Sequence, residues 1–311
     1  MKRIFFIVVL TPIFVFSQQT KEVLFLGNSY TYVNDLPNMV KQIALSFGDT
    51  LNYDQNTPGG ATLQMHSTNT QTLSKISQQQ WDNVIIQCQS QEPSFSPSQV
   101  SNDVFPYAQI LIDSIESNSV CTEPMFFMTW GRKYGDQQNC QFYPPICTYL
   151  GMQQRLRESY LEMTFNENAS CAPVGMAWKA SITQDSTLDL YTADYSHPSI
   201  HGSYLSACVF YASIFKKSPM GSSYWPSGID SITAYNLQQI ASNTVLDSLS
   251  SWNIFKANFT YQQFNDSIYF SNQSSNYDNI IWNFGDGNVS YANNPIHIYT
   301  SSGTYVISLI I

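Results

Sequence analysis

Runs of consecutive apolar residues alternate along most of the chain with segments in which apolar residues recur every three or four positions. The first run covers residues 23–27, and the segment after it keeps helical spacing until Gly48. Consecutive apolar residues are typical of buried strands, and the wider spacing is typical of amphipathic helices. The same succession recurs. Further strands are expected at residues 84–88, 125–130 and 172–178, and further helices near residues 97–117, 150–166, 200–216 and 231–250.

Strands that alternate with helices predict an α/β fold. The continuous apolar character of the strands indicates a parallel sheet covered on both faces, which makes a three-layer α/β/α arrangement with right-handed crossovers. Ligands of such sheets bind at the carboxyl ends of the strands. We therefore expect the chemistry directly after residues 27, 57, 88 and 130.

The pattern changes near residue 258, where helical spacing is lost and Asn, Ser, Tyr and Gly become frequent. Short alternating runs surround the turn Gly285-Asp286-Gly287, which is a hairpin signal. The sequence therefore predicts an α/β domain over residues 18–257 and a small antiparallel β module over residues 258–311.

Residues 1–17 have the features of a signal peptide, with Lys2 and Arg3 ahead of an apolar stretch that ends at small Ser17. The alternative, a membrane anchor, needs about 20 apolar residues, and this stretch is shorter. We expect cleavage near Gln18 and a protein that is secreted or held at the cell surface, with no membrane span after cleavage.

Composition narrows the class of protein. The 311 residues are 43% hydrophobic and 11% charged, which excludes a disordered chain and a charged coiled coil. The net charge is −9 with only 13 Lys and Arg residues, so the basic surface of a nucleic-acid-binding protein is missing.

The six cysteines suit an oxidising compartment. Cys140 and Cys147 lie in one segment and could close a loop, and Cys121 and Cys171 could link the starts of neighbouring strands. Cys88 and Cys208 lie inside apolar runs and are expected to be buried thiols.

A serine follows the first strand in Gly27-Asn28-Ser29, where its hydroxyl could face the edge of the sheet that carries the chemistry. Alone, such a serine is more often a helix cap. The segment Pro58-Gly59-Gly60 lets a backbone amide approach a ligand closely. Amide side chains cluster at the end of another strand in Gln87-Cys88-Gln89, where burial without partners would be costly.

Asp194 precedes His197 by three residues, so its carboxylate can orient the imidazole and leave the second ring nitrogen to accept a proton from a serine. His201 offers an alternative, because Asp194, His197 and His201 could be metal ligands. Pro198 interrupts helical presentation, no HExxH-like glutamate is present and no cysteine joins the group. We therefore expect neither a metal nor a cofactor.

Taken in order, these segments resemble the blocks of the SGNH or GDSL hydrolase superfamily, in a branch with Gly-Asn-Ser at the first block. The resemblance covers about residues 22–250 and implies a flavodoxin-like sheet. It implies Ser29 as nucleophile, Asp194 and His197 as its partners, and an oxyanion hole made by the amides of Ser29 and Gly60 with the Gln89 side chain. In this superfamily the first block usually has Asp where this chain has Asn28, and the third block usually has Asn where this chain has Gln89.

Further residues near strand ends or the second block are candidates for the substrate pocket. They are Asn28, His66, Trp130, Arg132 and His201.

The C-terminal module resembles the PKD domain, an immunoglobulin-like β-sandwich. The motif consists of Trp282-Asn283-Phe284-Gly285-Asp286-Gly287, Pro295, His297, Tyr299 and Gly303-Thr304-Tyr305. In that family the last strand normally runs further, so the resemblance implies a module that is incomplete at its C-terminus.

Together the two resemblances imply a secreted serine esterase with an ester substrate, such as acyl groups on extracellular polysaccharide, and surface contact through the PKD-like module. Two alternatives stay open. One is a noncatalytic glycan-binding or adhesion protein, and the other is an acyltransferase that uses the same triad.

Overall fold

The computed structural model describes residues 18–255, 257, 259–264, 267–274, 279–301 and 303–311. The signal peptide expected over residues 1–17 lies outside the described residues. Within them, no helix combines the length and the apolar character needed to cross a bilayer.

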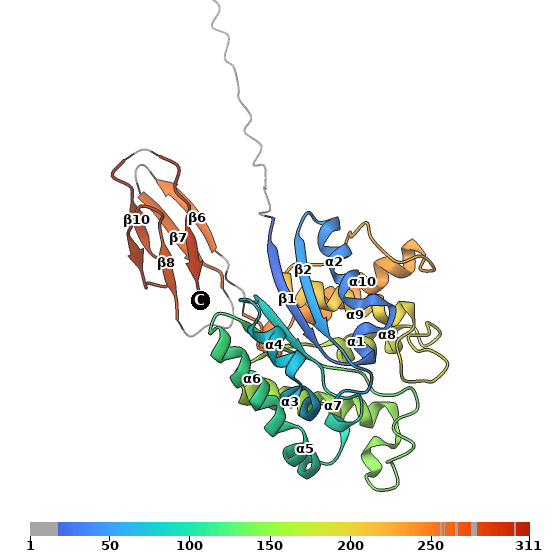
Figure 1. The fold of residues 1–311 in the computed structure, drawn as a ribbon. Helices are drawn as coiled ribbons and strands as arrows, with labels where there is room; N and C mark the ends of the chain where they lie inside the picture. Colours follow the sequence, from blue (N-terminus) through green and yellow to red (C-terminus); the bar gives the residue numbers. More distant parts are fainter. Residues whose placement is uncertain (1–17, 256, 258, 265–266, 275–278, 302) are drawn as a thin grey trace, which may run out of the picture.

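A five-stranded sheet forms the centre of the first domain (Figure 1). Its strands, in spatial order, are β2 (Thr50–Asn56), β1 (Thr20–Leu26), β3 (Asn83–Ile86), β4 (Glu123–Phe127) and β5 (Ser170–Ala172). All neighbouring strands run parallel, as the sequence predicted. The 2-1-3-4-5 order reverses direction between β1 and β3, and ligands of such sheets bind in the crevice at this switch point.

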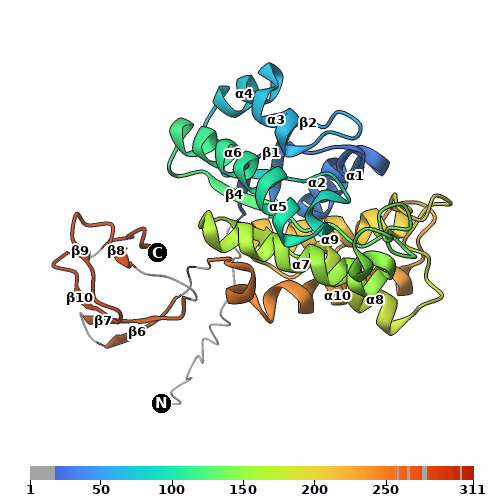
Figure 2. The same cartoon turned by 90° about the horizontal axis from the view of Figure 1, so that it is seen from below.

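Helices cover both faces of the sheet (Figures 1 and 2). One group of helices consists of α1 (Ser29–Tyr32), α2 (Leu36–Ser46), α8 (Val174–Gln184), α9 (Ile200–Phe215) and α10 (Ser231–Leu246). The other consists of α3 (Leu63–Thr68), α4 (Thr70–Ser77), α5 (Pro97–Asp103), α6 (Phe105–Asn118) and α7 (Tyr149–Asn166). Short 3-10 helices lie at Val33–Asp35, Glu92–Ser94, Pro144–Cys147 and Leu249–Trp252.

Helix α9 is apolar along almost its whole length because it is buried in the middle of a helical layer. Its residues from Gly202 to Phe215 are all buried, because α2, α8 and α10 pack around it. Phe210 meets the rings of Phe25 on β1 and Phe127 on β4 edge to face. Burial of a side chain of this size stabilises the fold by about 1.5–3 kcal/mol, so α9 anchors the segment that precedes it, which carries Asp194 and His197.

Two boundaries differ from the prediction. The helix expected over residues 97–117 is divided at Val104, because Pro106 can begin a helix but cannot continue one. The strand expected over residues 172–178 ends at Ala172, and α8 begins at Val174. A short apolar run fits a buried helix as well as a buried strand. Here a Cβ atom at Gly175 would lie only 2.1 Å from the Thr129 carbonyl oxygen, so the helix approaches the β4 loop as closely as a glycine allows.

The C-terminal residues form two three-stranded antiparallel sheets with a core of their own around Phe270, Trp282 and Phe284. Their strands are β6 (Phe259–Phe264), β7 (Ser267–Asn272), β8 (Ile281–Asn283), β9 (Val289–Ser290), β10 (Ile296–Ile298) and β11 (Ser308–Ile310). The predicted hairpin joins β8 to β9, with positive φ at Gly285 and Gly287.

The cysteines follow the prediction in part. Cys140 and Cys147 form a disulfide, and Cys88 and Cys208 are buried thiols. The expected link between Cys121 and Cys171 is wrong, because both are free. Cys171 is buried in β5 opposite Phe126 of β4, whereas Cys121 lies exposed in the turn before β4.

Candidate active site

Ser29 begins α1 at the carboxyl end of β1. The residue before it, Asn28, caps this helix through its side-chain oxygen, which accepts a hydrogen bond from the Tyr30 amide at 3.1 Å. Gly27 makes the tight turn possible, because a Cβ atom there would lie 2.5 Å from Thr31 Oγ1 and 2.6 Å from Gln87 Oε1. The chain therefore leaves the strand abruptly and presents the Ser29 hydroxyl at the edge of the sheet.

Gln87, directly after β3, stabilises this turn through hydrogen bonds of its side chain. Its side-chain oxygen accepts hydrogen bonds from the Asn28 amide at 3.0 Å and from the Thr31 hydroxyl at 2.7 Å. Its amino group donates to Asn28 Oδ1 and to the Cys88 carbonyl, both at 2.8 Å. The carboxamide is fully buried and fully bonded. The sequence indicated that a buried amide in this cluster needed partners, but it did not show that Gln87 had them in the serine turn.

His66 supports the turn from a second side. Its Nε2 lies 2.9 Å from the Gly27 carbonyl and its Nδ1 lies 2.9 Å from Thr72 Oγ1. Because a carbonyl can only accept, Nε2 carries the proton and Nδ1 accepts from Thr72. Burial lowers the pKa of His66, although the bond to Gly27 acts in the opposite direction. With 1% of its surface exposed, His66 does not line a substrate pocket as predicted.

The loop before α9 brings Asp194 and His197 to Ser29. His197 Nδ1 is hydrogen-bonded to Asp194 Oδ2, and His197 Nε2 lies 2.8 Å from Ser29 Oγ. Since the carboxylate can only accept, Nδ1 carries the proton and Nε2 is free to accept the proton of the serine hydroxyl. The structure therefore joins the three predicted residues in one hydrogen-bonded chain.

The second carboxylate oxygen of Asp194, Oδ1, fixes the side chain in this loop by accepting hydrogen bonds. Asp194 Oδ1 accepts from the amides of Ser196 and His197, each at 2.9 Å, and from the Thr192 hydroxyl at 2.8 Å. Partial burial alone would raise the pKa of the Asp194 carboxyl. The hydrogen bonds from His197 and the backbone outweigh it and hold that pKa well below its usual range. Asp194 is therefore a carboxylate throughout the neutral range.

Tyr30 and Trp130 stabilise the loop of Asp194 and His197 through hydrogen bonds to Ser196. The Tyr30 hydroxyl lies 2.6 Å from Ser196 Oγ, and Trp130 Nε1 donates to the Ser196 carbonyl at 2.9 Å. The Trp130 ring is stacked between Tyr30 and Trp178, with centroid distances of 4.5 Å and 4.0 Å. Trp130 is fully buried, so it positions the loop and does not line a pocket as predicted.

The amides of Ser29 and Gly60 have no hydrogen-bond acceptor in the described part of the chain. Gly60 has φ +72 and is exposed, with open space at its Cβ position. Asn28 ties the two segments together, because its amino group donates to the Ala61 carbonyl at 3.0 Å. Asn28 is buried, so it holds these amides in place and is not part of a pocket surface. Free N–H groups of the serine itself and of a segment tied to its turn are suited to an oxyanion.

The Gln89 side chain, which the resemblance implies as an oxyanion donor, is hydrogen-bonded within its own loop. Its carboxamide oxygen accepts from the amides of Gln91 at 2.6 Å and Glu92 at 3.2 Å, and its amino group lies 3.3 Å from Gln91 Oε1. The strand ends at Ile86, so residues from 87 onward no longer alternate between faces and Gln89 is turned into the following loop. Among the described residues no hydrogen bond joins Gln89 to Ser29, Asp194 or His197.

His201 lies in the first turn of α9, where it is half-buried, and its imidazole makes no hydrogen bond in the described structure. No three His, Cys, Asp or Glu side chains of the described ranges are grouped as metal ligands. The geometry therefore does not support a site formed by Asp194, His197 and His201.

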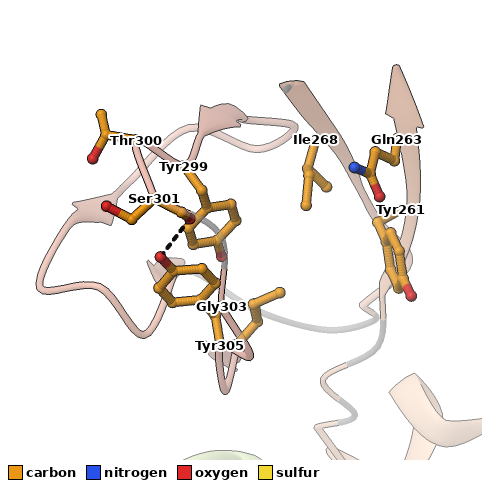
Figure 3. Close-up of a pocket in the computed structure, with 9 residues that line it drawn as sticks. Tyr261, Gln263, Ile268, Tyr299, Thr300, Ser301, Gly303 and Tyr305 are labelled. Carbon is orange, nitrogen blue, oxygen red and sulfur yellow. Dashed lines mark hydrogen bonds between the residues drawn. The ribbon is translucent and has the colours of Figure 1, made fainter. Parts of the chain in front are cut away.

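A separate hollow of about 590 Å³ lies in the C-terminal module (Figure 3). Tyr261, Tyr299 and Tyr305 line it, and the last two rings are stacked 4.0 Å apart. The Tyr305 hydroxyl donates to the Ser301 carbonyl at 2.8 Å. This hollow contains none of the residues around Ser29.

Comparisons with known proteins agree with this architecture. The sheet order and helical layers are those of the SGNH hydrolase fold, and residues 258–311 match the family of the PKD domain. The α/β part is similar in structure to a DUF4886 family protein from Bacteroides uniformis, with 18% identity, a TM-score of 0.62, and coverage of 73% of this chain and 95% of that one.

It is also similar to a proposed SGNH hydrolase from Slackia heliotrinireducens, with 24% identity, a TM-score of 0.52, and coverage of 62% of this chain and 97% of that one. At these identities the likeness concerns the fold. No curated protein matches the sequence.

Proposed function

We propose that this protein is a serine esterase of the SGNH type, which hydrolyses carboxylic esters through an acyl-enzyme on Ser29. The observation that carries the proposal is the chain of hydrogen bonds from Ser29 Oγ through His197 to Asp194. A serine hydroxyl becomes a useful nucleophile when an adjacent base takes its proton and a third group orients that base. Each of these roles has one residue here.

In the first half of the reaction, His197 Nε2 takes the proton of Ser29 while Oγ attacks the ester carbonyl carbon. The negative charge that develops on the carbonyl oxygen is stabilised by the amides of Ser29 and Gly60. The intermediate then collapses, the bond to the alcohol breaks, and His197 returns the proton to the departing alcohol. Asp194 stabilises the imidazolium in between.

In the second half, water enters, His197 takes one of its protons and the resulting hydroxide attacks the acyl-enzyme. The acid leaves, and Ser29 recovers its proton from His197. Each step balances without a metal or cofactor, since only protons and an acyl group are transferred.

Acyl groups on an extracellular polysaccharide are the substrate class we propose. Tyr195, between Asp194 and Ser196, is half-exposed and packs edge to face against the exposed ring of Tyr134 at 4.9 Å. Exposed aromatic rings are enriched at binding surfaces because they offer large contact area at low entropic cost. A pair of such rings, one of them on the loop of Asp194 and His197, is suited to the apolar faces of sugar units.

The proposed substrate implies export, and the signal-like residues 1–17 support it. If the leader is removed as proposed, amino-terminal sequencing of the protein recovered from the medium or cell surface will begin near Gln18. A mature protein that still carries the apolar stretch contradicts this step.

The PKD-like module is proposed to provide contact with polysaccharide. We expect a chain ending at Ala257 to keep its turnover on a small soluble ester and to lose retention on the polymer. Loss of small-ester activity by a folded protein of this length contradicts this division of labour.

A serine-directed fluorophosphonate probe tests the proposal itself. The parent protein should be labelled at Ser29 and should hydrolyse p-nitrophenyl acetate and acetylated oligosaccharides. Ser29→Ala and His197→Ala should abolish both properties while the protein stays folded, and Ser117→Ala, at an exposed helical position, is the matched control. Absence of labelling would indicate a binding protein, and labelling with transfer to an alcohol in preference to water would indicate an acyltransferase.

A further inference from the structure

Arg132 lies in the loop that follows β4. This loop is at the carboxyl ends of the strands, as is Ser29. Its side chain is 23% exposed, and none of its guanidinium N–H groups makes a hydrogen bond within the described residues. Nε is buried with no partner. A guanidinium has five donors, and buried polar groups are satisfied in nearly all native proteins. A largely buried cation with no hydrogen bond therefore requires an explanation.

Asp136 is the ion-pair partner of Arg132, but the hydrogen bonds of its carboxylate go to other groups. Arg132 Nη1 lies 3.7 Å from Asp136 Oδ1, which is too far for a hydrogen bond. Asp136 Oδ2 accepts from Gln91 Nε2 at 2.8 Å and Asn139 Nδ2 at 2.7 Å, and Oδ1 accepts from the Gln138 amide at 3.2 Å. The Asp136 carboxylate thus stabilises the loop that contains the Cys140–Cys147 disulfide. It accepts no hydrogen bond from the guanidinium of Arg132.

The same loop is joined to the candidate active site. The Lys133 amide donates to the Tyr195 carbonyl at 2.9 Å, which fixes the Arg132 backbone beside the Asp194–His197 loop. Burial raises the pKa of Tyr30, and hydrogen bonds to its hydroxyl and the positive charge of Arg132 act against that rise. Lys133 itself is paired with Asp189 at 3.2 Å. Arg132 is thus the cation of this loop whose hydrogen-bond donors are unused.

We infer that Arg132 binds a carboxylate carried by the ester substrate, so that the enzyme selects acidic esters, such as acyl groups attached to or forming part of an acidic carbohydrate. The planar fork of a guanidinium matches a carboxylate in two parallel hydrogen bonds. The net charge of −9 repels anions in general, which makes a local cation necessary for such a substrate. This inference rests on the proposed esterase activity.

Matched ester pairs test the inference. Mono-p-nitrophenyl glutarate against p-nitrophenyl valerate places a carboxylate on the acyl side, and p-acetoxybenzoate against its methyl ester places one on the alcohol side. We expect the parent to prefer the acidic member of at least one pair by about 10-fold to 100-fold in kcat/KM, as charge-assisted hydrogen bonds predict. The preferred pair shows which side of the ester Arg132 binds. High salt should reduce the preference.

Arg132→Met should remove this preference through KM on the acidic ester while turnover of the neutral ester is retained. Arg132→Lys should keep part of it, because the charge remains and the fork is lost. Lys21→Met is the control, since it removes one positive charge at the opposite edge of the sheet, where Lys21 pairs with Asp82 at 3.4 Å.

The inference is overturned if the parent hydrolyses both members of each pair equally, or if Arg132→Met lowers both rates together with the melting temperature. The second result would make Arg132 a structural residue. Failure of the proposed function would look different, because no ester would be hydrolysed and Ser29 would remain unlabelled.

Discussion

The hydroxyl groups of Tyr30 and Ser196 lie 2.6 Å apart, although 166 residues separate them in the chain. Tyr30 directly follows the serine that we propose as nucleophile, and Ser196 directly precedes the histidine that we propose as base. The Tyr30 ring also meets the His197 ring edge to face at 5.4 Å. This one contact therefore connects the two segments whose separation would abolish the chemistry.

The first prediction concerns this contact. Tyr30→Phe keeps the ring stacked on Trp130 and removes only the hydroxyl, so we expect kcat to fall by up to about 10-fold, the value of one hydrogen bond, with KM nearly unchanged. Ser196→Ala should have the same effect, and the double variant should be no worse than either single one. Tyr235→Phe, on the exposed face of α10, is the control. Additive losses in the double variant would show that the two hydroxyls act separately.

Asp194→Asn should lower kcat by about 10,000-fold, because the amide favours the wrong imidazole tautomer. The Asn oxygen can still accept from the Ser196 and His197 amides, but the charged form that the fold stabilises is lost, so the melting temperature at neutral pH should fall modestly. Kinetics and thermal unfolding measured on one preparation check both statements. A loss of only a few-fold would mean that the carboxylate does not orient His197.

Gln87 and Gln89 should respond in opposite ways. Gln87→Leu leaves the Asn28 amide and the Thr31 hydroxyl without their buried acceptor, so we expect a loss of about 1–3 kcal/mol per unsatisfied group and a fall in kcat as the serine turn loosens. Gln89→Ala should lower the melting temperature and leave kcat nearly intact. A 100-fold to 1,000-fold fall in kcat for Gln89→Ala, which is the cost of one oxyanion donor, would restore the role that the family resemblance implied.

His66 should make stability depend on pH. Its pKa in the folded state is lowered by burial, so the unfolded chain binds the proton more readily. The contribution of neutral His66 is fully present above the unfolded pKa of about 6.5 and is lost as pH falls below it. Unfolding free energy measured from pH 8 to pH 5 should therefore fall less steeply in His66→Gln than in the parent. Equal slopes would show that protonation of His66 is not resisted by the fold.

Much of the fold was predictable because local spacing reflects burial. The alternation of apolar runs with helical spacing predicted β1, β3, β4 and the helices α2, α7, α9 and α10 nearly at their observed places. The run at residues 174–178 was assigned to a strand and is a helix, since five apolar residues carry no period that separates the two. Tertiary packing on the β4 loop decided that case.

The residues of the candidate site also fall into those that the sequence predicted and those that only the tertiary structure revealed. The sequence singled out Ser29, Asp194 and His197 through the order of its blocks, which resembles that of the SGNH superfamily, and through the Asp-x-x-His spacing that lets a carboxylate orient an imidazole. Tertiary structure alone decided which neighbours support them. Gln87, His66 and Trp130 have side chains equally suited to a pocket or to an interior, and only the packing of distant segments placed their polar atoms against the serine turn and the histidine loop. Tertiary structure likewise decided that Arg132 makes an ion pair with Asp136 and yet no hydrogen bond to it, because this depends on distances in space that sequence spacing does not contain.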